Sequence, residues 1–236
     1  MLASWPPAVG GEAPGEVFIT RASLTEERST APDPAETVIA HIGDSITATS
    51  YLPFDRRIDA LLNAACLKDF PGRRIRNINL EVDGEYIGEF LDTGRYQSAI
   101  KEHLAKIDIA VIQYGSNDSR RYDAAEFKKR LGALCDTPAV DYPGIRFVIA
   151  TGPYIHGADD ANLKQYGPFW QAARDLAAAR SFPLADVYKA FEARKDHALS
   201  IKEGDAHPSA AGVALRAETE FAALRTLLAA PAKAKP

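Results

Sequence analysis

Short apolar runs alternate with helical patterns along most of the chain. Three continuous runs rich in β-branched residues are typical of strands buried on both faces of a sheet, at residues 37–42 (TVIAHI), 107–114 (IDIAVIQY) and 145–151 (IRFVIAT). Two weaker runs, at 73–80 and 182–185, have the length of short strands. The pattern therefore predicts five strands.

Apolar residues at helical spacing fill the stretches between these strands. They predict helices over 54–66, over 86–106 with a break at 92–94, and over 124–135, 163–180 and 208–228. The last helix begins at Pro208, a residue favoured in a first helical turn. Alternating strands and helices indicate an α/β fold, and we expect a three-layer αβα sandwich with a five-stranded, mainly parallel, flavodoxin-like sheet.

The chain divides into one folded domain and two terminal segments. Residues 1–35 are rich in Pro, Gly, Ala and Glu and predict an extended or partly disordered arm, in which 17–19 could alternatively form an edge strand. Residues 36–229 form the predicted domain, and 230–236 a flexible tail. The 236 residues are 46% hydrophobic and 25% charged, as in ordinary globular proteins.

Composition excludes several kinds of partner. A net charge of −4 and a pI near 5.8 provide no basic face for nucleic acid or for an anionic membrane surface. No apolar run approaches the roughly 20 residues of a membrane span, and we expect no intact signal peptide, although the compartment and the oligomeric state stay open. Cys66 and Cys135 lie in helical patterns and are interpreted as buried free thiols.

Four short polar motifs fall where the predicted elements should bring them together. Three follow strands, at 43–47 (GDSIT), 83–85 (DGE) and 115–118 (GSND), and the fourth, at 204–208 (GDAHP), precedes the last helix. In open α/β sheets, ligands bind outside the carboxyl ends of the strands. We therefore expect the four motifs to converge at that edge.

In this order, the motifs resemble the sequence blocks of the SGNH (GDSL-like) hydrolase family, over residues 38–217. The resemblance implies a serine esterase with Ser45 as nucleophile and His207 as general base. It also implies an oxyanion hole made by the backbone N–H groups of Ser45 and Gly84 and by the side-chain amide of Asn117. Each residue also has a structural reading: Ser45 or His207 as a helix N-cap, and Gly84 or Asn117 as a turn residue.

The chemistry of acyl transfer requires these residue types. A serine hydroxyl attacks a carbonyl only when a positioned base takes its proton, and an imidazole suits this task at neutral pH. Preorganised donors must then stabilise the negative charge on the tetrahedral oxygen. A glycine at position 84 lets that oxygen approach the backbone closely.

The carboxylate of the expected triad departs from the family pattern. The usual motif is DxxH, but position 204 is glycine, and the nearby carboxylates are Asp205, two residues before His207, and Glu203, four residues before. A triad acid must reach the imidazole and fix its tautomer. We choose Asp205, with Glu203 and a Ser–His dyad as alternatives.

Aromatic side chains after the fourth strand are candidates for a substrate pocket. Tyr154 and His156, together with Tyr166 and Trp170, could line it, because pockets favour aromatic walls with a few polar groups. Packing within the core is the alternative for all four side chains.

The sequence favours hydrolysis of a small ester, such as an acetylated carbohydrate or another short-chain acyl ester. The absence of clustered metal ligands, a Walker A loop and GxGxxG indicates no metal and no cofactor. Two alternatives remain. One is a catalytically silent SGNH module that binds carbohydrate, and the other is a flavodoxin-like protein whose loop at 45–50 holds FMN.

Overall fold

A computed structural model describes residues 35–229, except for the side chain of Leu163. Five parallel strands form one sheet in the order β2-β1-β3-β4-β5, which is the flavodoxin-like order. Their bounds are β1 Glu36–Gly43, β2 Arg74–Asn79, β3 Ile109–Gln113, β4 Arg146–Ala150 and β5 Leu184–Ala185. The predicted α/β class and strand number are confirmed; the predicted segments 1–35 (all but its last residue) and 230–236 lie outside the described residues.

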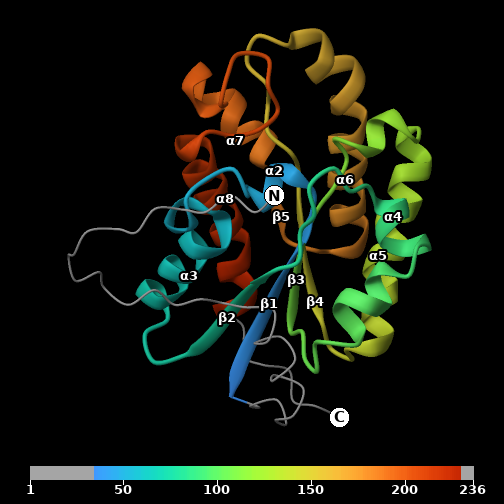
Figure 1. Cartoon of the computed structure of the whole chain (residues 1–236), viewed down its shortest axis with the longest axis vertical. Coiled ribbons are helices and arrows are strands. Elements are labelled where there is room, and N and C mark those ends of the chain that lie inside the picture. The colour runs from blue at the N-terminus through green and yellow to red at the C-terminus, as the bar shows by residue number, and fades with distance from the viewer. Residues whose placement is uncertain (1–34, 230–236) are drawn as a thin grey trace, which may run out of the picture.

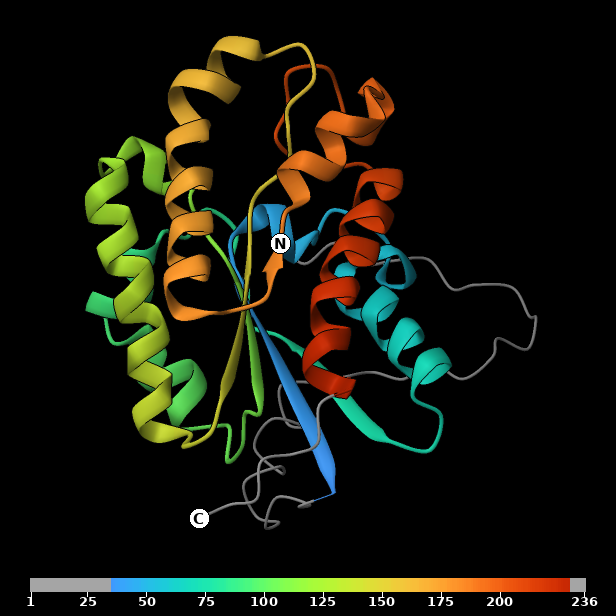
Figure 2. The same cartoon turned by 180° about the vertical axis from the view of Figure 1, so that it is seen from behind.

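Helices cover both faces of the sheet, which gives the three layers expected (Figures 1 and 2). Helices α3 and α8 lie on one face, and α4, α5 and α6 lie on the other, while α2 and α7 stand at the carboxyl end of the strands. Their bounds are α2 Ser45–Ala48, α3 Ile58–Asp69, α4 Ile87–Asp92, α5 Ala124–Asp141, α6 Gly167–Arg180, α7 Val187–Arg194 and α8 Ala210–Ala229. Short 3₁₀ turns (54–56, 118–120, 197–199) and π turns (97–101, 161–166) complete the described part.

Differences from the expected bounds have local causes. The helix expected from residue 54 begins at Ile58, because 54–56 forms a 3₁₀ turn, and the one expected from 163 begins at Gly167 after a π turn. The last helix starts at Ala210 rather than Pro208, because Pro208 pairs with Ser200 in an isolated β-bridge. Helix α7 was not predicted.

Burial on both faces explains why the central strands dominate the sequence pattern. All five residues of β3 are buried. Alternate residues face two separate cores, with Ile39 and Val111 on the α3/α8 side and Ile42 and Ile112 on the α4/α5/α6 side. Such rows of β-branched side chains pack well on a pleated surface. The free thiols of the two cysteines are buried, as expected.

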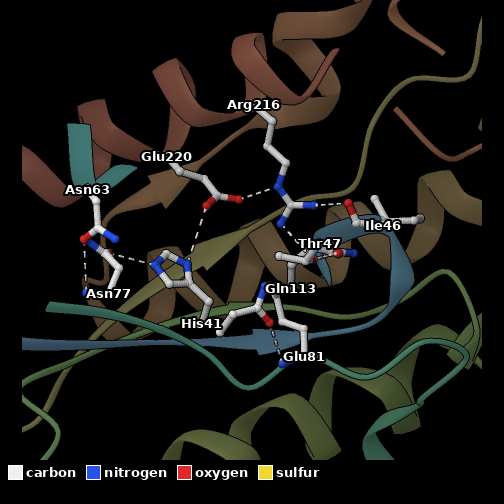
Figure 3. Close-up of polar contacts among 10 residues, drawn as sticks. His41, Ile46, Thr47, Asn63, Asn77, Glu81, Gln113, Arg216 and Glu220 are labelled. Carbon is white, nitrogen blue, oxygen red and sulfur yellow. Dashed lines mark hydrogen bonds and ion pairs between the residues drawn. The ribbon is translucent and has the colours of Figure 1, made fainter. Parts of the chain in front are cut away.

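The core on the α3/α8 side is polar near the carboxyl end of the sheet (Figure 3). We call His41, Asn77, Glu81, Gln113, Arg216 and Glu220 the buried polar cluster. The Nε2 atom of His41 lies 2.9 Å from Oδ1 of Asn77, and Arg216 Nε donates to Oε1 of Glu220 at 2.6 Å. Burial lowers the pKa of His41, which favours the neutral imidazole.

Glu81 enters this cluster from the segment that follows β2. Within the described part of the chain, both of its carboxyl oxygens are buried and neither has a hydrogen-bond partner. Burial raises the pKa of Glu81 well above its ordinary value, because a charged carboxylate loses its hydration there. The neutral acid is therefore the favoured form of this side chain in the folded protein.

This burial predicts a pH-dependent cost to stability. In the unfolded chain Glu81 ionises near pH 4.5, while in the folded protein it keeps its proton to higher pH. Above that pH the unfolded state binds fewer protons, so stability falls as pH rises toward the folded pKa. Glu81→Gln removes this loss. We expect the melting-temperature difference between Glu81→Gln and wild type to grow as the pH rises above about 5.

The exposed Glu192 offers a matched control, because Glu192→Gln removes a solvated carboxylate. Its melting-temperature difference should stay flat over the same range. A flat difference for Glu81→Gln as well would contradict the buried neutral acid.

Candidate active site

Ser45 is the first residue of α2, and Asp44 alone separates it from the end of β1. Asp44 caps this helix: its Oδ1 accepts the backbone N–H of Ile46 at 3.0 Å, and its carbonyl accepts the N–H groups of Thr47 and Ala48. Burial raises the pKa of Asp44 to about 7. The first N–H groups of a helix have no intrahelical acceptor, so the Ser45 N–H remains available to a ligand.

Ser45, His207 and Asp205 form a continuous hydrogen-bonded chain. The Oγ of Ser45 lies 2.9 Å from Nε2 of His207, and Nδ1 of His207 lies 2.8 Å from Oδ1 of Asp205. A carboxylate only accepts, so Nδ1 carries the proton and donates it, which leaves Nε2 as acceptor for the serine hydroxyl. This is the tautomer that a general base requires.

Asp205 is held in its ionised form. Partial burial works to raise its pKa, but hydrogen bonds from the backbone and the ring of His207 outweigh this and lower the pKa below its ordinary value. The same Oδ1 atom accepts the backbone N–H of His207 at 2.9 Å. One carboxylate oxygen thus fixes both the backbone turn from Asp205 to His207 and the orientation of the imidazole.

Glu203, the alternative carboxylate, lies elsewhere. Its side chain is 73% exposed, and its Oε1 lies 3.7 Å from Nδ1 of His197. Between the two carboxylates, Gly204 adopts a positive φ of 73°, a conformation that glycine reaches without strain. Of the two acids named from the sequence, the structure brings only Asp205 to His207.

The residues expected to form the oxyanion hole lie in neighbouring loops. The Nδ2 group of Asn117 donates to the carbonyl of Glu85 at 3.1 Å, next to Gly84 in the chain. Gly84 has a φ of 80°, and a Cβ there would meet nothing within 4 Å. Backbone conformation, not space, therefore favours glycine at position 84.

Asp118 fastens the loop of Asn117 to the neighbouring segment. Its Oδ1 accepts the N–H of Ile87, the first residue of α4, and its Oδ2 accepts the N–H of Gly115, both at 3.0 Å. Burial raises the pKa of Asp118 to about 6. The carboxyl therefore joins the 115–118 motif to the start of α4, two residues after the 83–85 motif.

A second buried carboxyl supports the same loops. Glu85 accepts the hydroxyl hydrogen of Tyr114 at 2.5 Å and pairs with Arg95 Nε at 2.9 Å. Sequence reasoning missed this triplet, because its members are distant along the chain and Tyr114 and Arg95 belong to none of the polar motifs.

Tyr51 is a further residue that the sequence pattern did not identify. Its ring meets the His207 ring edge-on with centroids 5.7 Å apart, and its hydroxyl donates to the carbonyl of Pro208 at 2.8 Å. The side chain is 41% exposed. The only signal in the sequence was an aromatic residue in the loop that follows the serine.

The aromatic pocket candidates separate into two groups. Trp170 and Tyr166 are buried in the core, and a Cβ at Gly115 or Gly152 would lie 2.5 Å from the Trp170 ring. These two rings therefore pack within the core, which is the alternative that the sequence left open for them.

Tyr154 and His156 lie beside α7. Their rings are 5.0 Å apart, and Nε2 of His156 lies 3.2 Å from the carbonyl of Phe191. The carbonyl of His156 accepts the N–H of Gly204, which connects the pair to the loop of Asp205. A role for Tyr154 and His156 in substrate binding stays a prediction.

Two other structural features bear on the function. Among residues 35–229, no group of three or more His, Cys, Asp or Glu side chains is arranged to hold a metal ion. No helix within that range is long and apolar enough to cross a membrane.

Solved structures share the fold at low sequence identity. An α/β hydrolase, LAE5, from the metagenome of Lake Arreo in Spain is 24% identical, covers 81% of this chain and 96% of its own, and superposes with a TM-score of 0.67. Axe2, an acetylxylan esterase from Geobacillus stearothermophilus, is 21% identical over 80% of this chain and 94% of its own, with a TM-score of 0.66. The lipase/acylhydrolase from Enterococcus faecalis is 19% identical over 84% of this chain and 100% of its own, also at 0.66.

A search among curated protein sequences finds no match. The family comparison identifies the chain instead: residues 41–215 match the GDSL-like Lipase/Acylhydrolase family. This range is most of the chain and contains all four motifs. The chain therefore belongs to that family and is a carboxylic ester hydrolase.

Proposed function

We propose that the chain hydrolyses a short-chain acyl ester at Ser45 through an acyl-enzyme intermediate. The observation that carries this proposal is the hydrogen-bonded chain from Ser45 Oγ through the His207 imidazole to Asp205. Asn117 and Gly84, in neighbouring loops, support an oxyanion hole at the same edge of the sheet.

The reaction proceeds in two halves. The Ser45 oxygen attacks the ester carbonyl while Nε2 of His207 takes the hydroxyl proton, and the ionised Asp205 stabilises the imidazolium. Collapse of the tetrahedral intermediate breaks the bond to the alcohol, which leaves with the proton from Nε2. Water then attacks the acyl-serine by the same route, releasing the carboxylic acid and restoring the serine hydroxyl.

The oxyanion donors act in both halves. The N–H groups of Ser45 and Gly84 and the amide of Asn117 meet the negative oxygen of each tetrahedral state. Since these donors are held by the α2 cap and by the Asn117–Glu85 bond, they need little rearrangement when charge develops.

For the substrate we favour an acetylated carbohydrate or another short-chain ester. The half-exposed ring of Tyr51 stands beside His207 and offers an apolar face to a sugar ring or a small alcohol. Axe2, whose fold is similar, is an acetylxylan esterase. No cofactor has a part in this reaction.

The site geometry weighs against a silent carbohydrate-binding module. That alternative rested on the missing DxxH spacing, yet Asp205 makes the short contact with Nδ1 that the family's usual acid would make. The FMN alternative shares the sheet order but gives no reason for the contact between Ser45 and His207.

Ser45→Ala removes the nucleophile and should lower kcat by about six orders of magnitude. The assay compares both proteins on para-nitrophenyl acetate, butyrate and octanoate and on acetylated sugars, with acetate release as readout for the last. We expect the highest wild-type rates on acetyl substrates. Equal rates for wild type and variant on every substrate would refute the esterase proposal.

Asn117→Ala removes one oxyanion donor without altering charge. It should reduce kcat about a hundred- to thousandfold, while KM and melting temperature change little, because the side chain acts on the transition state. Initial rates measured over a range of substrate concentrations give kcat and KM separately. Wild-type kcat in this variant would remove Asn117 from the oxyanion hole.

Asp205→Asn tests the displaced triad acid, and Glu203→Gln is its matched control. An amide at position 205 can donate to Nδ1 and favour the wrong tautomer, so kcat should fall about ten-thousandfold. Glu203→Gln alters an exposed side chain and should leave kcat unchanged. The opposite ranking would assign the role to Glu203, and two unaffected variants would indicate a dyad.

A further inference from the structure

Helices α2 and α8 are joined by one fully buried side chain. Arg216, in α8, uses three different nitrogens as donors (Figure 3). Nη1 donates to the carbonyl of Ile46 at 2.9 Å and Nη2 to Oγ1 of Thr47 at 2.8 Å, while Nε donates to Glu220. Two of the three acceptors belong to α2, the helix that begins with Ser45.

Helix α2 depends on such outside contacts. It has only four residues and ends at Ala48, and the next residue, Thr49, caps it with a positive φ of 47°. A helix this short has no stability of its own. Asp44 holds its beginning, and its end is held by Arg216 and by the hydroxyl of Thr47, which donates to Oε1 of Gln113 at 2.6 Å.

Helix α8 also determines where the general base stands. His207 precedes it by three residues, and the N–H of Val213 bonds back to the carbonyl of Ser209. The nucleophile therefore comes from α2, and its base comes from the segment that leads into α8. Their 2.9 Å contact depends on how α2 and α8 are placed.

We infer that Arg216 is a positioning residue, which fixes the nucleophile helix α2 against α8 and so sets the Ser45–His207 contact and the direction of the Ser45 N–H. This inference rests on the proposed role of Ser45. Glu220 acts with Arg216, because it neutralises and orients the guanidinium.

The chemistry of the guanidinium suits this task. Its planar fork of donors reaches three acceptors at fixed angles, whereas the ammonium of a lysine is a single point charge. Stability alone gives no reason for a buried ion pair, since an apolar pair of similar volume is often equally stable or more so. The placement of α2 by the Arg216–Glu220 pair gives a reason for burying these two charges.

The double variant Arg216→Met with Glu220→Met separates positioning from stability. Both charges disappear together, so no unpaired buried charge remains and we expect the protein to fold. If Arg216 positions α2, kcat per active site should fall about a hundredfold with KM little changed, as for a small misplacement of reacting groups. Active sites are counted by titration with a fluorophosphonate that reacts with the nucleophilic serine.

Two further variants complete the test. Thr47→Val keeps both charges and the side-chain shape but removes one acceptor of Arg216, together with the bond from Thr47 to Gln113, so it should lower kcat about tenfold at unchanged KM. The control is Arg180→Met with Asp136→Met, which removes the ion pair between α6 and α5. This control should alter the melting temperature without altering kcat.

Each outcome bears on one claim. Wild-type kcat in both the double variant and Thr47→Val would overturn the positioning role, and if the double variant fails to fold, Thr47→Val decides alone. Arg216→Lys should recover part of the lost kcat, because it keeps the charge and one donor nitrogen. A wild-type protein whose Ser45 is not labelled by the fluorophosphonate would instead overturn the proposed function.

Discussion

Parallel pairing of β1 with both β2 and β3 is the constraint on which the site depends. In register, Ile42 lies opposite Ile112, and His41 lies opposite Asn79 and Val111, so β1 and β3 end at the same level and β2 ends two residues short of it. Each loop that follows carries one polar motif. Because the hydrogen bonds of the sheet fix where the strands end, strand pairing itself places the motifs side by side at one edge of the sheet.

Buried carboxyl groups then hold the loops in place behind that edge. The Asp118 carboxyl accepts the N–H groups of Gly115 and Ile87, and the Asp44 carboxyl accepts the N–H of Ile46 in α2. Burial raises the pKa of both, so hydrogen bonding to backbone donors is obtained at an electrostatic cost. Rigid loops are what an oxyanion hole needs, since its donors must be in place before charge develops.

Local signals made the fold and most of the site predictable from sequence. The β-branched run of β3 and the motifs around Ser45 and Asn117 are contiguous, and order along the chain was sufficient to relate them. Arg216 and Glu85 could not be identified in that way, because their roles come from partners far away in sequence. The choice between Asp205 and Glu203 could not be decided from the sequence, because only the folded loop shows which of the two carboxylates reaches His207.

The turn at Asp205 has a mechanical consequence. One carboxylate oxygen holds both the backbone N–H and the ring of His207, so Asp205 and His207 form one hydrogen-bonded unit. Moving this segment away from α2 would separate His207 from Ser45 while the imidazole keeps its orientation. The same movement would break the hydrogen bond from Tyr51 to the carbonyl of Pro208, so more than one interaction holds the contact at the serine oxygen.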